Sequence, residues 1–443
     1  MHTARRRASF DRLMASSHST RPDPSHAELL AVSFAYPPLA YPRSGQVARL
    51  LRNTSFSTTL VCADERGAHR DPTLEPDAEA RLRACLRVPF LVSRSRRLAD
   101  ALASRARLPA WGKTPDQFAS WIPKALRAVA AFMKRHDYEP DILVSFGQPM
   151  SDHLVGLKLK RLFGVPWVAH FSDPWTDNPF NRQDALTRRL NLSLERRVMR
   201  NADLLAFTSR ETVELVMRKY PSEWTSKARV LPHSFDPSLY ARDARDGGGE
   251  HDGDVETVVR YTGEFYGRRT PRPLVETLRA ILSERPRLLE GVRFELIGPV
   301  APGVLEESGI ESLPRGLVET RPPVNYAESL ALAAAADGLL IVDAPAERSV
   351  FLPSKLVDYI GAARPILGLT PPGASDELIR RLGGWAADPS DAAAMRRATE
   401  AFLTFLSQHG NERRPWGDAQ VRAAYDARAV AASFETMLRE LLD

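Results

Sequence analysis

The chain has 443 residues, of which 61 are Lys or Arg and 55 are Asp or Glu, so its formal net charge is +6. With 43% hydrophobic and 26% charged residues, the composition is that of a globular protein and excludes a wholly disordered or fibrous chain. This length suits two domains of roughly 200 residues each. The small basic excess permits acidic partners such as phosphates, nucleotides or anionic lipid, but it does not require nucleic acid.

Cysteine content and hydropathy indicate the compartment. Cys62 and Cys85 are too few for a disulfide framework or a four-thiolate zinc site, so a cytoplasmic setting is predicted. No stretch reaches the ~18 apolar residues that a membrane span needs. Residues 1–24 carry several arginines with no apolar stretch behind them, which excludes a secretory signal and predicts a disordered basic lead-in over residues 1–25.

From Ala27 onward, short β-branched runs alternate with amphipathic helical stretches, a pattern typical of parallel sheets covered by helices. The first half contains six predicted strands: Leu29–Phe34, Thr58–Cys62, Ile142–Phe146, Trp167–Phe171, Leu204–Thr208 and Arg229–Leu231. A second series contains five: Val255–Tyr261, Arg293–Ile297, Leu317–Glu319, Leu339–Val342 and Ile366–Leu369. A predicted helix rich in Ala and Arg near the end, Ala419–Leu442, has no strand after it.

The segment Asp243–Asp254 holds four glycines among acidic residues and indicates a linker between two similar halves. Asp203 and Asp337 support this similarity, because each follows an alanine between a predicted helix and a predicted strand. The predicted organisation is an N-terminal domain over residues 26–240, a linker over 241–254, a C-terminal domain over 255–415 and a terminal helix within 416–443. Two doubly wound sheets imply a cleft at the carboxyl ends of their strands, where ligands of such sheets bind.

The segment Phe351–Ala362 predicts a helix that begins at Pro353 and Ser354. Its first-turn N–H groups, the Ser354 hydroxyl and the Lys355 ammonium would together suit a diphosphate. Asp358 lies one turn further on the same face, where a carboxylate suits the vicinal hydroxyls of a ribose. The alternative is a solvated Lys355–Asp358 pair on an ordinary amphipathic helix.

Three further segments at predicted strand ends carry candidate residues. Arg268 and Arg269 follow the Tyr261–Gly267 turn and would neutralise a phosphate, or else form a basic surface loop. Ser44 and Gly45 open a helix after a proline-stiffened loop, which suits an anion or a purely structural turn. His170 and Asp173 lie at the end of a strand in a loop rich in polar and aromatic residues. That loop suits a substrate, although His170 would also fit a core position and Asp173 a turn cap.

The sequence also argues against several functions. No clustered His or Cys spacing indicates a metal site. Hydrolase, ATPase and dehydrogenase fingerprints are missing as well. The eight arginines of Arg81–Arg107 alternate with apolar residues, which suits peripheral contact with anionic membrane or a solvated helix face. Phe90 alone offers an aromatic ring there, which weighs against RNA.

The run Leu352–Leu367 resembles the donor-binding signature of family 4 glycosyltransferases. The segments Tyr261–Arg269, Pro140–Ile142, Pro166–Trp175 and Leu231–Asp236 are similar to that family as well. The resemblance extends from about Ala27 to the end of the chain.

The resemblance implies a GT-B fold of the α/β class, with two facing Rossmann-like domains and a C-terminal helix that returns to the first domain. It implies a retaining transferase that uses a nucleotide-diphosphate sugar as co-substrate and needs no cofactor or metal. By this resemblance, Arg268 or Arg269 and Lys355 hold the diphosphate, and Asp358 holds the ribose. Ser44 and Gly45 approach the phosphates from the other domain, and His170 or Asp173 lies near the transferring sugar or the acceptor.

The family further suggests a saccharide or lipid-linked acceptor, a role in cell-envelope or exopolysaccharide synthesis, and a cytoplasmic or inner-membrane-peripheral location. Two positions depart from the family pattern: Val350 replaces the first carboxylate of the Glu-x7-Glu signature, and Glu264 follows Gly263 where many members have a basic residue. They motivate one alternative, a non-catalytic nucleotide-sugar-binding relative. A nucleotide-sugar epimerase of the same architecture is the other.

Overall fold

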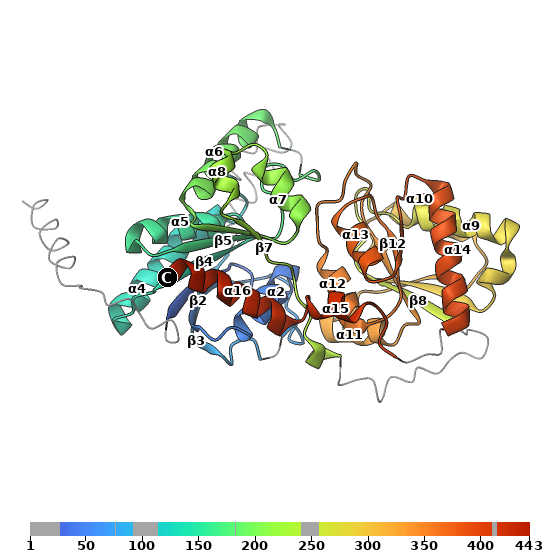
Figure 1. Cartoon of the computed structure of the whole chain (residues 1–443), viewed down its shortest axis with the longest axis horizontal. Helices are drawn as coiled ribbons and strands as arrows, with labels where there is room; N and C mark the ends of the chain where they lie inside the picture. Colours follow the sequence, from blue (N-terminus) through green and yellow to red (C-terminus); the bar gives the residue numbers. More distant parts are fainter. Residues whose placement is uncertain (1–26, 76, 92–113, 182, 241–256, 410–413) are drawn as a thin grey trace, which may run out of the picture.

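The computed structural model describes residues 27–75, 77–91, 114–181, 183–240, 257–409 and 414–443. The predicted lead-in and linker lie outside these residues. The described chain forms two α/β domains side by side, each built on one parallel sheet (Figure 1). The predicted fold class, GT-B with two doubly wound domains, is confirmed.

The N-terminal domain contains a seven-stranded parallel sheet in the order β3-β2-β1-β4-β5-β6-β7. Its strands are β1 Glu28–Val32, β2 Ser57–Glu65, β3 Leu82–Phe90, β4 Ile142–Gly147, β5 Trp167–Phe171, β6 Leu204–Phe207 and β7 Ala228–Val230. Its helices are α2 Pro42–Arg52, α4 Ile122–His136, α5 Ser151–Phe163, α6 Ala185–Asn201, α7 Arg210–Met217 and α8 Ser222–Thr225.

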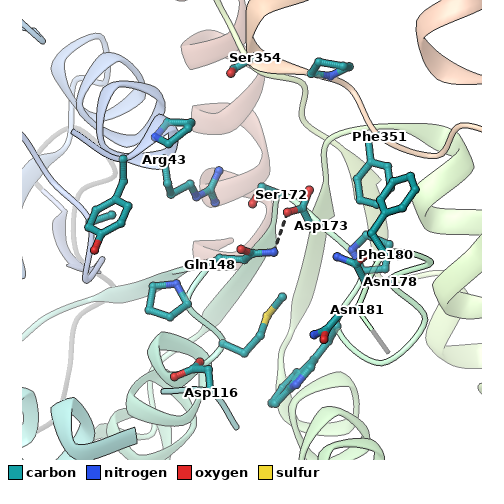
Figure 2. A pocket seen from close by; sticks show the side chains of 18 of the residues that line it. Arg43, Asp116, Gln148, Ser172, Asp173, Asn178, Phe180, Asn181, Phe351 and Ser354 are labelled. Atoms are coloured by element: carbon teal, nitrogen blue, oxygen red, sulfur yellow. Dashed lines mark hydrogen bonds between the residues drawn. The ribbon is translucent and has the colours of Figure 1, made fainter. Parts of the chain in front are cut away.

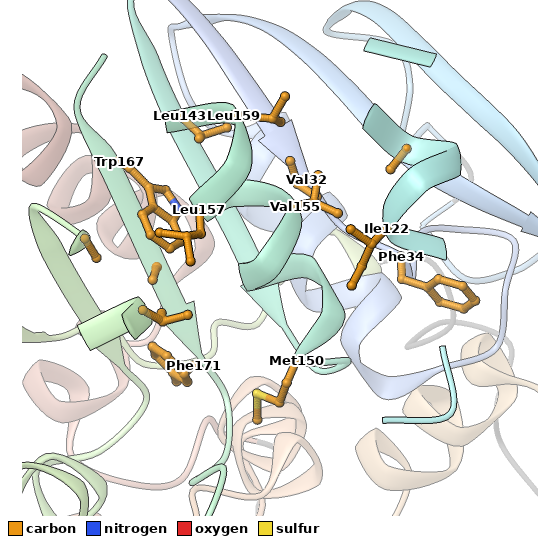
Figure 3. Close-up of a cluster of buried hydrophobic side chains, with 14 of the residues drawn as sticks. Val32, Phe34, Ile122, Leu143, Met150, Val155, Leu157, Leu159, Trp167 and Phe171 are labelled. Atoms are coloured by element: carbon orange, nitrogen blue, oxygen red, sulfur yellow. The ribbon is translucent and has the colours of Figure 1, made fainter. Parts of the chain in front are cut away.

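Alternate residues of these strands enter two separate cores, as the pleat of a strand buried on both faces requires. Side chains such as Val32, Leu143 and Trp167 pack under α4, α5 and α6 (Figure 3). Their neighbours, such as Ala31 and Ile142, pack under α2 and under the last helix of the chain, α16 Ala427–Leu442.

The C-terminal domain contains a six-stranded parallel sheet in the order β10-β9-β8-β11-β12-β13. Its strands are β8 Thr257–Thr262, β9 Val292–Ile297, β10 Val318–Arg321, β11 Gly338–Val342, β12 Ile366–Leu369 and β13 Trp385–Ala387. Helices α9 Arg272–Glu284 and α14 Ala392–His409 cover one face. The other face packs against α11 Tyr326–Ala334, α12 Ser354–Ala362 and α13 Ala374–Arg381.

Asp203 and Asp337 have equivalent roles in the two sheets. Asp203 Oδ2 accepts the Trp167 N–H at 2.7 Å, and Asp337 Oδ2 accepts the Val258 N–H at 2.8 Å. Each carboxylate therefore satisfies a donor at the start of the neighbouring strand, where the ladder leaves it unpaired.

Three predictions about secondary structure were wrong. The start of the arginine-rich segment is the edge strand β3 and not a helix face, since Leu82, Ala84, Leu86 and Val88 alternate with the polar side chains. Strand β13, at the edge of the second sheet, was missed. The predicted terminal helix is two helices, α15 Ala419–Ala423 and α16, because the Asp426 side chain caps a new start by accepting the Arg428 N–H.

Candidate functional site

A cavity of about 1050 Å³ lies between the domains, and loops at the carboxyl ends of both sheets line it (Figure 2). In each sheet these loops include the ones that follow the two strands where the strand order reverses, β1 and β4 in one domain and β8 and β11 in the other. Such switch points are where doubly wound sheets bind ligands. The cavity therefore lies where the sequence places the cleft.

Lys355 lines the C-terminal side of the cavity from the first turn of α12. Its Nζ donates to the Tyr261 hydroxyl at 2.9 Å and lies 4.3 Å from the centre of that ring. Burial, and then the positive charge of Arg269, lower the pKa of Lys355 to about 7. Gly263 makes this position possible, because a Cβ there would lie 1.8 Å from Nζ.

Glu264, Arg269 and Asp343 are the other charged residues that line this side of the cavity. Arg269 lines the cavity with its guanidinium 5.3 Å from the Tyr266 ring, whereas Arg268 is exposed and is not part of the lining. Asp343 directly follows β11 and is 7% exposed. Burial raises its pKa, and Arg269 and Lys355 oppose that rise. Two basic side chains thus face the cavity together with the carboxylates of Glu264 and Asp343.

Ser354 and Asp358 lie on the same helix, but they face different surroundings. Ser354 is the first residue of α12 and lines the cavity. Asp358 does not line it, because its Oδ1 accepts the Tyr326 hydroxyl at 3.0 Å and lies 3.7 Å from Arg49 Nη1 of the N-terminal domain. Burial raises the pKa of Asp358, and Arg49 opposes the rise. The ribose-binding role of Asp358 stays a prediction.

On the N-terminal side, Arg43 enters the cavity from the start of α2 (Figure 2). Its Nη2 lies 2.6 Å from His170 Nδ1 and donates to the His170 carbonyl at 3.3 Å. His170 itself does not line the large cavity, because it lies behind Arg43 in a small adjoining pocket. Burial and the charge of Arg43 lower the pKa of His170, so its imidazole is neutral. His170 is therefore placed to orient Arg43 and not to contact a ligand in the cavity.

Ser44 and Gly45 do not line the cavity either. Ser44 is fully buried, and a Cβ on Gly45 would lie 2.9 Å from the Leu74 side chain. Both residues therefore pack the first turn of α2 against the loop after β2. Pro42 and Arg43 reach the cavity in their place.

Asp173 lines the cavity after β5, as the sequence places it. Its Oδ2 accepts a hydrogen bond from Gln148 Nε2 at 2.6 Å, drawn as the dashed line in Figure 2. Burial raises the pKa of Asp173 to about 6, and the charge of Arg43 opposes that rise. The carboxylate is thus ionised at neutral pH but takes up a proton in mildly acidic solution.

Two contacts close the cavity between the domains near Val350. The Val350 carbonyl accepts hydrogen bonds from the hydroxyls of Ser209 and Thr212, both at 2.7 Å. Next to it, Phe351 stacks on Phe180 of the N-terminal domain with ring centres 5.3 Å apart. The Val350 side chain is 6% exposed and does not line the cavity. At this position the backbone joins the domains, and no side chain is presented to a ligand.

Arg43, Gln148 and Asp343 are candidate site residues that the sequence analysis does not single out. Each follows a predicted strand at its carboxyl end, and Arg43 directly precedes Ser44. The strand-end rule that selects Asp173 would have found them too.

The structure describes only the first part of the arginine-rich segment Arg81–Arg107. Of the arginines in Arg81–Arg107, Arg83 pairs with Glu28 and Arg87 with Glu79, while residues 92–113 lie outside the described chain. Within the described residues, no helix has the length and apolar character to cross a membrane, and no three His, Cys, Asp or Glu side chains are grouped to hold a metal ion.

Comparisons with known proteins agree with this geometry. Residues 42–233 match the model of the glycosyl transferase 4-like domain. A search of curated proteins finds no match.

Solved structures share the fold at low identity. HepE of Anabaena, in complex with UDP and glucose, superposes with a TM-score of 0.63 at 13% identity, over 94% of this chain and 100% of its own. Sucrose-phosphate synthase of Thermosynechococcus elongatus gives 0.59 at 16% identity, over 94% and 99%. An epimerase structure of Listeria monocytogenes, named as a putative UDP-N-acetylglucosamine 2-epimerase, gives 0.57 at 12% identity, over 94% and 97%. Residues 42–233 thus match a glycosyl transferase 4-like domain, and the two-domain architecture is that of the GT-B fold.

Proposed function

We propose that this enzyme transfers a sugar from a nucleotide-diphosphate sugar to a saccharide or lipid-linked acceptor, with retention at the anomeric carbon and without a metal. The observation that carries the proposal is the group formed by Lys355, Arg269 and the first turn of α12, which face one cavity from the C-terminal domain. The UDP and glucose bound to HepE make a uridine nucleotide the first donor to test.

The leaving group gains negative charge as its bond to the sugar breaks. Lys355 and Arg269 would stabilise that charge from fixed positions, because Tyr261 and Gly263 hold the Lys355 ammonium and Tyr266 lies against the Arg269 guanidinium. Preorganised donors of this kind typically lower a barrier by about 3–4 kcal/mol each. Two such groups would supply much of what a bound cation supplies in other transferases.

Asp173 and Arg43 face this group from the N-terminal domain. We assign Asp173 to the acceptor hydroxyl, from which its carboxylate would accept a proton, and Arg43 to the diphosphate. His170 would position Arg43 through the Nη2–Nδ1 contact of 2.6 Å. The acceptor is proposed to belong to cell-envelope or exopolysaccharide synthesis on the cytoplasmic side, as the family resemblance implies.

A thermal-shift screen of nucleoside diphosphates and their sugars tests the donor, since a ligand that binds the folded state raises the melting temperature. The wild type should respond to one base, and Lys355→Ala should lose turnover by about two to three orders of magnitude while remaining folded. Near-wild-type turnover of Lys355→Ala would contradict the assignment.

Incubation with the nucleotide sugar alone separates the transferase from the epimerase alternative. A transferase leaves the sugar configuration unchanged without an acceptor, whereas an epimerase interconverts two sugars. Donor binding without turnover of any acceptor would favour the non-catalytic alternative. The anomeric configuration of the product, read by NMR, and the rate in the presence of a chelator test retention and metal independence.

A further inference from the structure

Helix α6 exposes an unusual face. Thr187, Asn191, Glu195 and Val198 form its buried stripe. On the opposite side, Leu186 is 48% exposed and Leu190 is 40% exposed. The spacing of Leu186, Leu190, Arg197 and Arg200 by three, four or seven residues places them along one side of the helix. A solvated helix normally carries only polar residues on such a face.

The charge of this face is strongly positive. Arg189, Arg197 and Arg200 are exposed, and no carboxylate of the described residues lies within ion-pair distance of them. Arg188 pairs with Asp177 and Arg196 lies over the Trp224 ring, so these two are engaged at the edge of the face. Unpaired arginines beside exposed leucines match the composition of helices that lie in a lipid interface.

The position of this face relates it to the cavity. Helix α6 lies on the opposite side of the sheet from α16 (Figure 1). The side of α6 that faces the cavity is the buried one, since Thr187 and Asn191 belong to the cavity lining. The apolar and basic surface on the opposite side therefore faces away from the cavity.

We infer that Leu186, Arg189, Leu190, Arg197 and Arg200, here termed the α6 face, seat the enzyme on an anionic lipid surface. The arginines would contact lipid phosphates, and the leucines would enter the boundary between headgroups and acyl chains. This inference goes beyond the proposed function, because it concerns where the enzyme lies and not which sugar it transfers. By this inference the membrane contact is the α6 face and not the predicted segment Arg81–Arg107, in which Arg83 and Arg87 are already paired with carboxylates.

Co-sedimentation of the full chain with vesicles tests the inference. The wild type should bind vesicles of phosphatidylglycerol and phosphatidylcholine in equal parts, bind pure phosphatidylcholine far less, and lose binding as salt rises. The triple variant Arg189→Glu, Arg197→Glu, Arg200→Glu should lower the vesicle partition coefficient by roughly 100-fold, because each arginine near an anionic surface contributes about a factor of five. Leu186→Ser with Leu190→Ser should weaken binding without a change of charge.

A matched triple variant, Arg287→Glu, Arg315→Glu, Arg397→Glu, reverses three exposed charges of the C-terminal domain and should retain binding. Equal loss in both triple variants would mean that net charge alone drives binding, and absence of wild-type binding would also overturn the inference. Loss only in Arg81→Glu with Arg83→Glu would assign the contact to β3 instead. Calorimetry with the nucleoside diphosphate keeps the two proposals separate, since the α6 variants should bind it normally whatever the vesicles show.

Discussion

Arg49 of the N-terminal domain and Asp358 of the C-terminal domain face each other across the domain boundary, with 3.7 Å between Nη1 and Oδ1. The Tyr326 hydroxyl links them, since it accepts from Arg49 Nη2 at 2.6 Å and donates to Asp358 Oδ1 at 3.0 Å. Glu75 balances the Arg49 charge with a nitrogen–oxygen distance of 2.8 Å. Helix α12 is thus held by the other domain one turn beyond the residues that face the cavity.

The first prediction concerns this buried group. Arg49→Met removes the cation beside the buried Asp358 carboxylate and leaves Glu75 with Arg52 alone, which costs about 3–5 kcal/mol for a buried pair. Arg83→Met breaks an ion pair that is 43% exposed at the arginine and should cost at most about 1 kcal/mol. Urea unfolding of both variants measures the difference. Equal midpoints would show that the Arg49 group contributes nothing to stability.

The second prediction follows from Lys355. Its pKa is about 7 in the free enzyme, and a bound diphosphate stabilises the ammonium, so binding at pH 8 should take up a proton. Affinity should therefore fall as the pH rises above 7. Calorimetry of nucleoside diphosphate binding in buffers of different ionisation enthalpy measures the uptake, which Lys355→Met should abolish. Uptake that persists in Lys355→Met would assign the proton to another group.

The same shift affects stability. The pKa of Lys355 in the folded state lies below its ordinary value of 10.5, so the unfolded chain binds more protons between pH 7 and 10.5. Stability from this group therefore rises with pH across that window. Lys355→Met should flatten this part of the pH profile of urea unfolding.

Gly263→Ala should impair function more than stability. The new methyl group would occupy the Lys355 Nζ position, at 1.8 Å, and the flexible lysine can move away at low cost. We expect at least tenfold weaker binding of the nucleoside diphosphate and a nearly unchanged melting temperature. Gly316→Ala is the converse control, because Gly316 has φ +88° and open space around it. Its substitution should lower stability and leave binding intact.

The pKa of Asp173 should determine how turnover falls at acidic pH, the acidic limb of the pH–rate profile. Its carboxyl has a pKa of about 6, so a proton-accepting role requires turnover to fall as the pH drops through that value. Asp173→Asn should lower turnover by about 10²–10⁴-fold and remove this limb. Asp64→Asn removes a carboxylate that forms an exposed ion pair with Arg70, and this control should keep both the turnover and its fall near pH 6. A limb near pH 6 that survives in Asp173→Asn would contradict the proposed role.

Much of the fold is predictable because buried parallel strands read as short apolar runs. Trp167–Phe171 and Ile366–Leu369 have the predicted bounds, and most other strands agree within two residues. The two strands that the sequence analysis missed, β3 and β13, both lie at the edge of a sheet. Strand β3 is half solvated and rich in arginine, so its alternation resembles a polar surface. Strand β13 has no β-branched residue in its three positions, whereas the equally short β7 has Val230.

The site was less predictable, because a helix start does not fix which first-turn side chain reaches the ligand. Ser354 and Lys355 do face the cavity, whereas Arg43 does so in place of Ser44 and Gly45. The Asp358 contacts depend on Tyr326 and Arg49, which are distant in sequence.

Helix α16 has a consequence for how the chain reaches its native state. Val430, Phe434 and Leu438 complete the core beneath α2 in the N-terminal domain, although they are synthesised after the whole C-terminal domain. During translation, that apolar surface of the N-terminal domain therefore stays exposed until the C-terminal domain and α16 have been synthesised. Residues 27–240 expressed alone should bind chaperones or aggregate, and a separately supplied α16 peptide should restore their solubility.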